Sequence, residues 1–181
     1  MDDASLIARA KEGDLDAFAE LVRRYERRVR SVLAQLLDDE RDVEETAQDV
    51  FVQAWRNLPR FRGEAAAFTW LYRIAVNAAL MRLRRKRVPT EELSDAEPAA
   101  EPSPAARAAT SELREFLLAR VRALPFEYRT PLVLRDLEGL SNQEVADVLG
   151  ISVAAAKSRI HRARMQIRAE LEEWESGTER A

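Results

Sequence analysis

The stretch 141–168, SNQEVADVLGISVAAAKSRIHRARMQIR, predicts a helix-turn-helix. Ser141 and Glu144 have the spacing of a capping box, which opens a short helix. Gly150 then ends that helix at a tight turn, and a longer basic helix follows over about 153–173. A short helix, a turn glycine and a basic helix in this order favour a DNA-binding lobe over an isolated, solvated charged helix.

The basic helix has one apolar side and one polar side. Its buried stripe recurs at three- and four-residue steps and consists of Val153, Ala156, Ile160, Ala163 and Ile167. At about 100° per residue, the opposite side and its flanks hold Ala155, Lys157, Ser158, Arg159, His161, Arg162 and Arg164. A helix of this kind fits the major groove of DNA.

More helices precede this motif. The C-terminal lobe is expected to start with an amphipathic helix over about 111–123, which Leu124-Pro125 ends. Thr130-Pro131 predicts the start of the next helix, because proline is tolerated in a first turn, and Gly139 ends it. The N-terminal lobe is expected to contain four helices: about 3–12, a second capped by Asp14 or Asp16, about 40–57 and about 65–86.

Between the lobes lies a segment with little periodicity. Residues 88–110 contain four of the seven prolines, many acids and no aromatic residue, which indicates a flexible acidic linker. The sequence therefore predicts an all-α protein of two small helical domains, over 1–87 and 111–175, followed by a tail over 176–181.

Composition excludes several classes of protein. Among 181 residues there are only 5 glycines, no cysteine and one histidine, His161, so neither disulfides nor a His- or Cys-based metal centre is expected. Nothing supplies a nucleophile–base pair or a glycine-rich phosphate loop, so we expect no enzyme and no cofactor. The first residues do not form a signal peptide, and no apolar run approaches the roughly 20 residues of a membrane span, so a cytoplasmic protein is expected.

The net charge of −3 conceals a segregation of charges along the chain. Basic residues cluster over 82–87 and 157–168, whereas acids cluster over 38–49 and 91–101. This distribution suits a protein that contacts DNA in two places and a basic partner in another.

The fourth helix combines aromatic, basic and amide side chains. Arg73, Asn77 and Arg84 lie opposite its core stripe, and Phe61, Trp70 and Tyr72 are nearby. Aromatic planes beside cations are typical of single-stranded DNA binding. The alternative, that Trp55, Trp70 and Tyr72 are core residues, stays open at this point, as does an ordinary solvated face for the acidic helix 40–57.

Two long segments resemble a known family. DVEETAQDVFVQAWRNLPRFRGEAAAFTWLYRIAVNAALMRLRRKR (42–87) looks like region 2, and LPFEYRTPLVLRDLEGLSNQEVADVLGISVAAAKSRIHRARMQI (124–167) looks like region 4, of extracytoplasmic-function sigma factors in the sigma-70 family. The wording of 61–79 is similar to the envelope-stress group of that family. The resemblance implies promoter recognition, promoter melting and transcription initiation.

The resemblance also implies roles for particular residues. The −10 element would be bound by Phe61, Arg62, Gly63, Glu64, Ala65, Tyr72, Arg73, Asn77 and Arg84. The −35 element would be bound by Arg135, Asn142, Gln143, Ala155, Lys157, Ser158, His161 and Arg162. RNA polymerase would be bound by Asp42, Glu45, Gln48, Asp49 and Gln53.

The implied partners are promoter DNA, the β′ clamp helices and β flap of core RNA polymerase, and an anti-sigma factor. One departure from the family is Ala154-Ala155-Ala156, where Gly-Thr-Val is frequent, so the −35 preference is open. A regulator with a helix-turn-helix output is the rival interpretation. It would need a phosphoacceptor pocket or a ligand cavity, and the sequence of the N-terminal lobe indicates neither.

Overall fold

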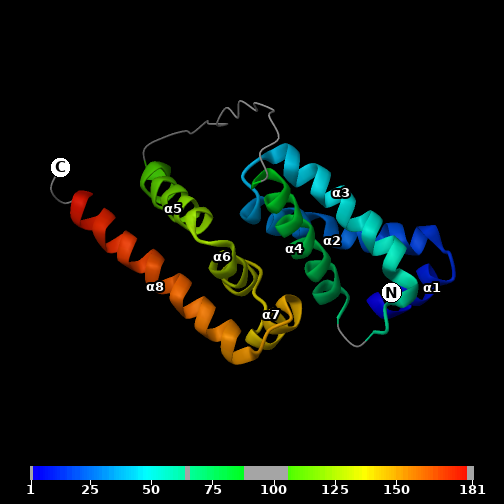
Figure 1. Ribbon diagram of the computed structural model, residues 1–181. Coiled ribbons are helices and arrows are strands. Elements are labelled where there is room, and N and C mark those ends of the chain that lie inside the picture. Colours follow the sequence, from blue (N-terminus) through cyan, green and yellow to red (C-terminus); the bar gives the residue numbers. More distant parts are fainter. Residues whose placement is uncertain (1, 64–65, 88–105, 179–181) are drawn as a thin grey trace.

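The structure is a computed structural model that describes residues 2–63, 66–87 and 106–178. The first half contains α1 (Asp3–Lys11), α2 (Leu15–Leu36), α3 (Glu40–Asn57), the 3₁₀ turn η1 (Leu58–Arg60) and α4 (Ala67–Arg87). The second half contains α5 (Ala106–Ala123), α6 (Phe126–Leu132), the π-helical turn η2 (Val133–Leu137), α7 (Asn142–Leu149) and α8 (Val153–Thr178) (Figure 1). No strand occurs in these described stretches, which confirms the all-α prediction.

The N-terminal lobe is built around α2. This helix begins where the Asp14 carboxylate accepts a hydrogen bond from the Ala17 amide at 3.0 Å, so Asp14 rather than Asp16 is the cap. Its inner side chains, including Val29 and Leu33, are fully buried against α3 and α4. Helix α1 also packs against α2.

The C-terminal lobe is built around α8. Helices α6 and α7 pack against its N-terminal half, and α5 runs antiparallel beside its C-terminal half. The Phe116 and Trp174 rings lie 5.2 Å apart, and Arg120 lies 3.2 Å from Glu170. These contacts explain why α8 continues to Thr178, beyond the predicted end near 173.

Two helix starts differ from the prediction. Helix α5 begins at Ala106, within the segment predicted as linker, and the other linker residues lie outside the described part of the chain. Helix α6 begins at Phe126, and Pro131 lies inside it, so the predicted start at Thr130-Pro131 is wrong. The Pro125 carbonyl instead accepts the first amides, and the chain widens into the π-helical turn η2 soon after Pro131, which lacks a donor.

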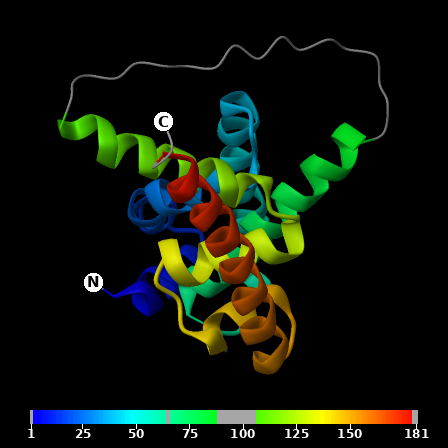
Figure 2. The same cartoon turned by 90° about the vertical axis from the view of Figure 1, so that its left-hand side faces the viewer.

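The two lobes touch each other. Helix α4 packs against α7, while α2 contacts α5, α6 and η2. Figures 1 and 2 show α8 on the outer side of the C-terminal lobe, away from α1. Within the described residues, no helix has the length and hydropathy that crossing a bilayer requires.

Candidate nucleic-acid interface

Helix α8 presents the predicted polar face to solvent. Ala156, Ile160 and Ala163 are buried against α6 and α7, as the stripe predicts. The exposed residues of the predicted −35 face are Lys157, Ser158, His161 and Arg162, whereas Ala155 is half-buried. The face therefore carries cationic and hydroxyl groups that can donate hydrogen bonds to the phosphates and base edges of DNA.

Local hydrogen bonds fix the turn before α8. The Ser141 hydroxyl accepts from the Glu144 amide at 3.2 Å, and the Glu144 carboxylate accepts from the Ser141 amide at 2.7 Å. These bonds lower the pKa of Glu144, so the capping box is charged near neutral pH. Gly150 takes a left-handed conformation with φ of 65°, and the Ser152 hydroxyl caps α8 through the Ala155 amide. The predicted helix-turn-helix is thereby confirmed.

Three further residues of the predicted −35 set lie before this turn. Arg135 is half-buried and donates to the Leu140 carbonyl at 2.6 Å, so its guanidinium also holds the turn that leads to α7. Asn142 is half-buried, and Gln143 is exposed with its amide 2.9 Å from Asp147. The structure brings all three to the start of α7, beside α8.

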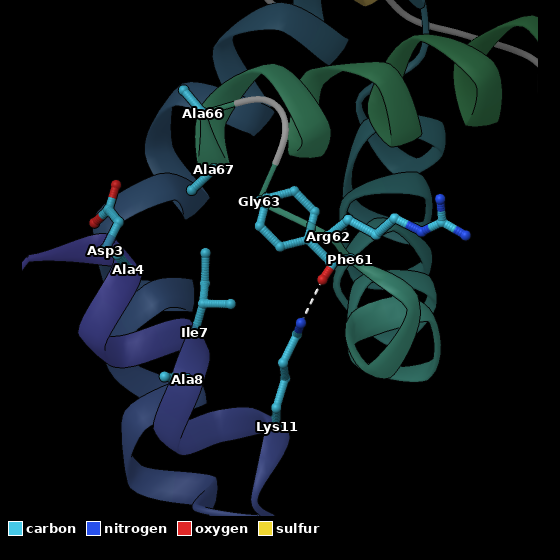
Figure 3. A pocket seen from close by; sticks show the side chains of 10 residues that line it. All are labelled: Asp3, Ala4, Ile7, Ala8, Lys11, Phe61, Arg62, Gly63, Ala66 and Ala67. Atoms are coloured by element: carbon cyan, nitrogen blue, oxygen red, sulfur yellow. Dashed lines mark hydrogen bonds between the residues drawn. The ribbon is translucent and has the colours of Figure 1, made fainter.

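A cavity of about 560 Å³ lies between α1 and the loop before α4. Phe61, Arg62 and Gly63 line one side, and α1 lines the other through residues that include Ile7 and Lys11 (Figure 3). The Lys11 ammonium donates to the Phe61 carbonyl, and the Arg62 side chain extends away from α1. The contribution of α1 was not predicted, because no local pattern links residues so far apart in sequence.

The Phe61 ring packs against Trp70 with ring centroids 4.8 Å apart. Gly63 has φ of 74°, a conformation that glycine adopts without strain. The predicted residues Glu64 and Ala65 lie outside the described part of the chain. The loop thus presents one half-buried ring and an exposed cation beside a cavity.

The remaining predicted −10 residues are not equally accessible. Tyr72 is 1% exposed, and its hydroxyl donates to Glu138 of the other lobe at 2.8 Å. Burial and this hydrogen bond raise the pKa of Tyr72 well above its ordinary value. Arg73, Asn77 and Arg84 are exposed. The sequence left open whether Tyr72 is a core residue. In this arrangement it is buried, as a core residue would be.

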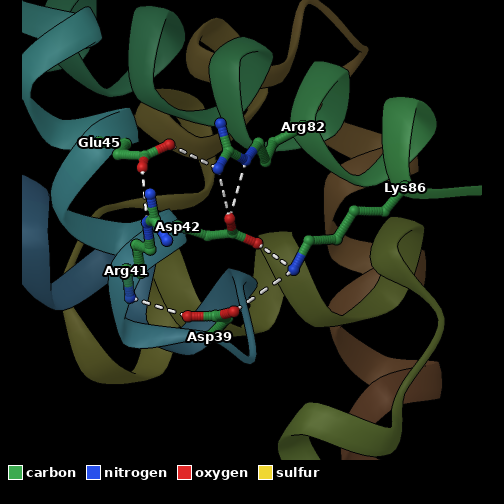
Figure 4. A network of polar contacts seen from close by, with 6 residues as sticks. All are labelled: Asp39, Arg41, Asp42, Glu45, Arg82 and Lys86. Atoms are coloured by element: carbon green, nitrogen blue, oxygen red, sulfur yellow. Dashed lines mark hydrogen bonds and ion pairs between the residues drawn. The ribbon is translucent and has the colours of Figure 1, made fainter. Parts of the chain in front are cut away.

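Part of the acidic helix is neutralised by α4. Asp42 is buried, and its carboxylate lies 2.6 Å from the Arg82 guanidinium and 2.5 Å from the Lys86 ammonium (Figure 4). Burial opposes the charge on Asp42, but the hydrogen bonds from Lys86 and Arg82 outweigh it and lower the pKa. Glu45 accepts from Arg82 and Arg41, which lowers its pKa as well.

The other three residues of the predicted polymerase-binding set are free of this network. Gln48, Asp49 and Gln53 are exposed on α3. The structure thus divides the predicted set into an exposed group and a pair that joins α3 to α4. In the described stretches of chain, no group of three or more His, Cys, Asp or Glu side chains is arranged to hold a metal ion.

Comparison with known proteins places these features in context. Residues 21–88 match the family model of Sigma-70 region 2, and residues 115–167 match that of Sigma-70, region 4. The chain is similar to the ECF RNA polymerase sigma-E factor of Haemophilus influenzae, with 35% identity over 176 residues that cover 91% of this chain and 93% of that protein. The sigma-E factor of Escherichia coli K12 is 36% identical over 176 residues, covering 91% and 92%.

A solved structure of CnrH in complex with the cytosolic domain of CnrY has a similar fold. It aligns with a TM-score of 0.72 and 31% identity, covering 94% of this chain and 97% of that one.

Proposed function

The chain belongs to the extracytoplasmic-function sigma factors of the sigma-70 family, and on this premise we propose how its surfaces divide the work of promoter recognition. It is a transcription initiation factor rather than an enzyme: it directs RNA polymerase to promoters. Region 2 corresponds to the N-terminal lobe and region 4 to the C-terminal lobe.

We propose that α8 reads the −35 element in the major groove. The observation that carries this assignment is the exposed face of Lys157, Ser158, His161 and Arg162 on the second helix of a well-capped helix-turn-helix. Arg162 can donate two parallel hydrogen bonds to a guanine edge, and Ser158 lies one turn away on the same face. The start of α7, with Asn142 and Gln143, would contact the adjacent backbone.

We propose that the −10 element is captured by the loop before α4. The 560 Å³ cavity beside Phe61 and Gly63 has room for an unpaired base, and a glycine permits close approach of the DNA. Arg62, Arg73 and Arg84 supply exposed cations for phosphates, and the Asn77 amide can read a base edge.

We propose that the exposed part of α3 binds the clamp helices of the polymerase β′ subunit. Gln48, Asp49 and Gln53 are available to a partner. Asp42 and Glu45 contribute indirectly, because their ion pairs with Arg82 hold α3 against α4. Region 4 would contact the β flap.

The similarity to CnrH supports one further partner. Since that protein binds the cytosolic domain of CnrY, we propose that this chain binds the cytosolic segment of an anti-sigma factor. Polymerase and promoter DNA would be met in the cytoplasm.

Transcription with purified components tests the proposal. Sigma-free core polymerase, supplied with this chain and a library of genomic fragments, should produce transcripts from a defined set of promoters. Arg162→Ala should reduce them, whereas Arg168→Ala, a matched change further along α8, should not. Transcripts identical to those of core polymerase alone would contradict the proposal.

A further inference from the structure

A second cavity lies where the two lobes meet. It has a volume of about 340 Å³, and its walls come from α4 of region 2 and from α6, α7 and α8 of region 4. Helices α4 and α7 pack against each other here (Figure 1). Ligand pockets in proteins commonly have this size and occur preferentially between domains. Apart from Asn77, the residues of this cavity have no role in the promoter recognition proposed above.

Most of the wall is apolar. The residues that supply it are Val76 and Leu80 of α4, Phe126 and Pro131 of α6, and Val148 and Leu149 of α7. Val76, Pro131 and Val148 are buried, and the other three are half-buried. An aliphatic chain that lies against this wall is removed from water, which favours its binding.

One cation faces this apolar wall. Arg159 of α8 lines the cavity and is half-buried. Among the described residues, none forms an ion pair or a hydrogen bond with its guanidinium, whereas Arg164 of the same helix is paired with Asp136. A half-buried guanidinium of this kind is suited to bind a carboxylate, because it can donate two parallel hydrogen bonds to it.

A second charged group limits how much negative charge the cavity accepts. Glu127 of α6 also lines it, and its carboxylate forms no ion pair with Arg159. Glu127 is exposed, so water and salt screen its charge more than that of the half-buried Arg159. The cavity therefore favours a ligand with one negative charge and disfavours a second charge near Glu127.

We propose that this cavity binds a small amphipathic monocarboxylate, such as a medium-chain fatty acid. Arg159 holds the carboxylate, and the apolar wall covers the alkyl chain. Such a ligand contacts both lobes, so it stabilises the arrangement in which they touch as its free concentration rises. It also covers Asn77 and competes with a −10 strand. This last consequence rests on the −10 role proposed for Asn77, whereas binding of the ligand does not.

Isothermal titration calorimetry of the full chain with octanoate tests the site. A single equivalent should bind, and the affinity should rise about fourfold for each methylene between hexanoate and octanoate. Octan-1-ol lacks the charge, and octanedioate must place a second charge beside Glu127 or against the apolar wall. Each should bind at least about tenfold more weakly than octanoate. Octanoate that binds no more tightly than octan-1-ol would overturn the proposal.

Substitutions of the cation provide the matched comparison. Arg159→Gln should weaken octanoate binding at least about tenfold, because the amide donates without a charge. Arg159→Lys keeps the charge and should retain more of the affinity than Arg159→Gln. Arg168→Gln, exposed further along α8 and outside the cavity, should bind octanoate as the wild type does. Equal affinity of Arg159→Gln and the wild type contradicts the assignment.

Methyl NMR of the full chain locates the ligand. Octanoate should shift the methyl signals of Leu80, Val148 and Leu149, which line the cavity from both lobes. Shifts confined to other methyl groups, such as Leu171 near the C-terminal end of α8, would mean that octanoate binds elsewhere and that the proposal is wrong.

Competition with DNA tests the consequence separately. Octanoate at about ten times its Kd should weaken the binding of a short fluorescein-labelled single-stranded DNA up to about tenfold, the limit for competition at one site. The same concentration should have little effect on DNA binding by Arg159→Gln. If calorimetry and NMR agree with the site but DNA binding is unchanged, the −10 role of Asn77 is wrong. If calorimetry or NMR fails, the ligand site is wrong.

Discussion

Arg82 donates two hydrogen bonds to the same carboxylate oxygen of Asp42, from Nε at 2.9 Å and from Nη2 at 2.6 Å. Asp42 lies in the first turn of α3 and Arg82 in the last part of α4, so the pair joins two helix ends that are 40 residues apart in the chain. Lys86 adds an ion pair to the other oxygen. Asp42, one residue of the predicted polymerase-binding set, thus joins α3 to α4 within region 2.

Asp42→Asn should lower the free energy of unfolding. The amide keeps the size of the side chain but loses its charge, and hydrogen bonds to a charged group contribute about 1.5–3 kcal/mol. We expect a loss of about 2 kcal/mol in urea unfolding followed by circular dichroism. Asp49→Asn, on the exposed side of α3, should stay within about 0.5 kcal/mol of the wild type. Equal losses would show that Asp42 has no special role.

The same pair predicts a dependence on pH. The folded pKa of Asp42 lies below its ordinary value of about 3.9, so the ion pairs stabilise the fold above that value and this stability is lost as the pH falls through the folded pKa. The difference in the free energy of unfolding between the wild type and Asp42→Asn should therefore be largest at pH 7 and should decrease in strong acid. Unfolding curves across this range check the prediction. A difference that grows on acidification would contradict it.

Lys11→Met should impair promoter opening. Its ammonium donates to the Phe61 carbonyl and joins α1 to the loop proposed to capture a base. Methionine keeps the apolar stem but cannot donate, so opening should fall by about fivefold, the scale of one exposed hydrogen bond. Permanganate reactivity of the −10 region measures opening. Duplex −35 binding serves as the control, and a loss there would indicate a general folding defect.

Asp49→Lys should weaken binding to core polymerase. Asp49 is exposed on α3 and has no place in the network around Asp42, so the fold should tolerate the change. Reversing one charge at an interface rim acts chiefly on the association rate and increases its sensitivity to salt. Surface plasmon resonance with core polymerase at two salt concentrations measures both. Glu40→Lys, exposed at the start of the same helix, is the matched control. Equal effects would mean that net charge, rather than this site, decides binding.

Features encoded by neighbouring residues could be predicted from the sequence. The capping box at Ser141 and Glu144, the turn at Gly150 and the stripe through Ile160 all depend on spacings of a few residues, and the structure has them as predicted. The start of α6 could not be predicted as easily, because the first-turn rule for proline points to Pro131, whereas the helix begins directly after Pro125 and contains Pro131.

The sites were harder to predict where a residue's environment comes from far along the chain. Tyr72 has the spacing of a DNA-facing aromatic, yet its hydroxyl meets Glu138, 66 residues away. Asp42 looks like its exposed acidic neighbours, yet Arg82 and Lys86 approach it from another helix. Helix periodicity describes one helix at a time and carries no information about such pairings.

Arg162→Ala separates two ways in which α8 can bind DNA. Arg162 is exposed and lies beside the buried Ala163, so its side chain contributes nothing to the core and the fold should tolerate the change. If Arg162 reads a base, the full chain should lose about 1–3 kcal/mol of affinity for its −35 duplex and become indifferent to one base pair. If it contacts phosphate alone, the loss should be similar for every sequence and the salt slope should fall by about one unit. We expect base readout, because Ser158 lies one turn away and can share a base step.

Fluorescence anisotropy with single-base variants of the −35 duplex at two salt concentrations distinguishes base readout from phosphate contact. Arg168→Ala, whose side chain lies 3.5 Å from Glu172, is the control on the same helix. Unchanged affinity of Arg162→Ala for every duplex at both salt concentrations would mean that another face of α8 meets the DNA.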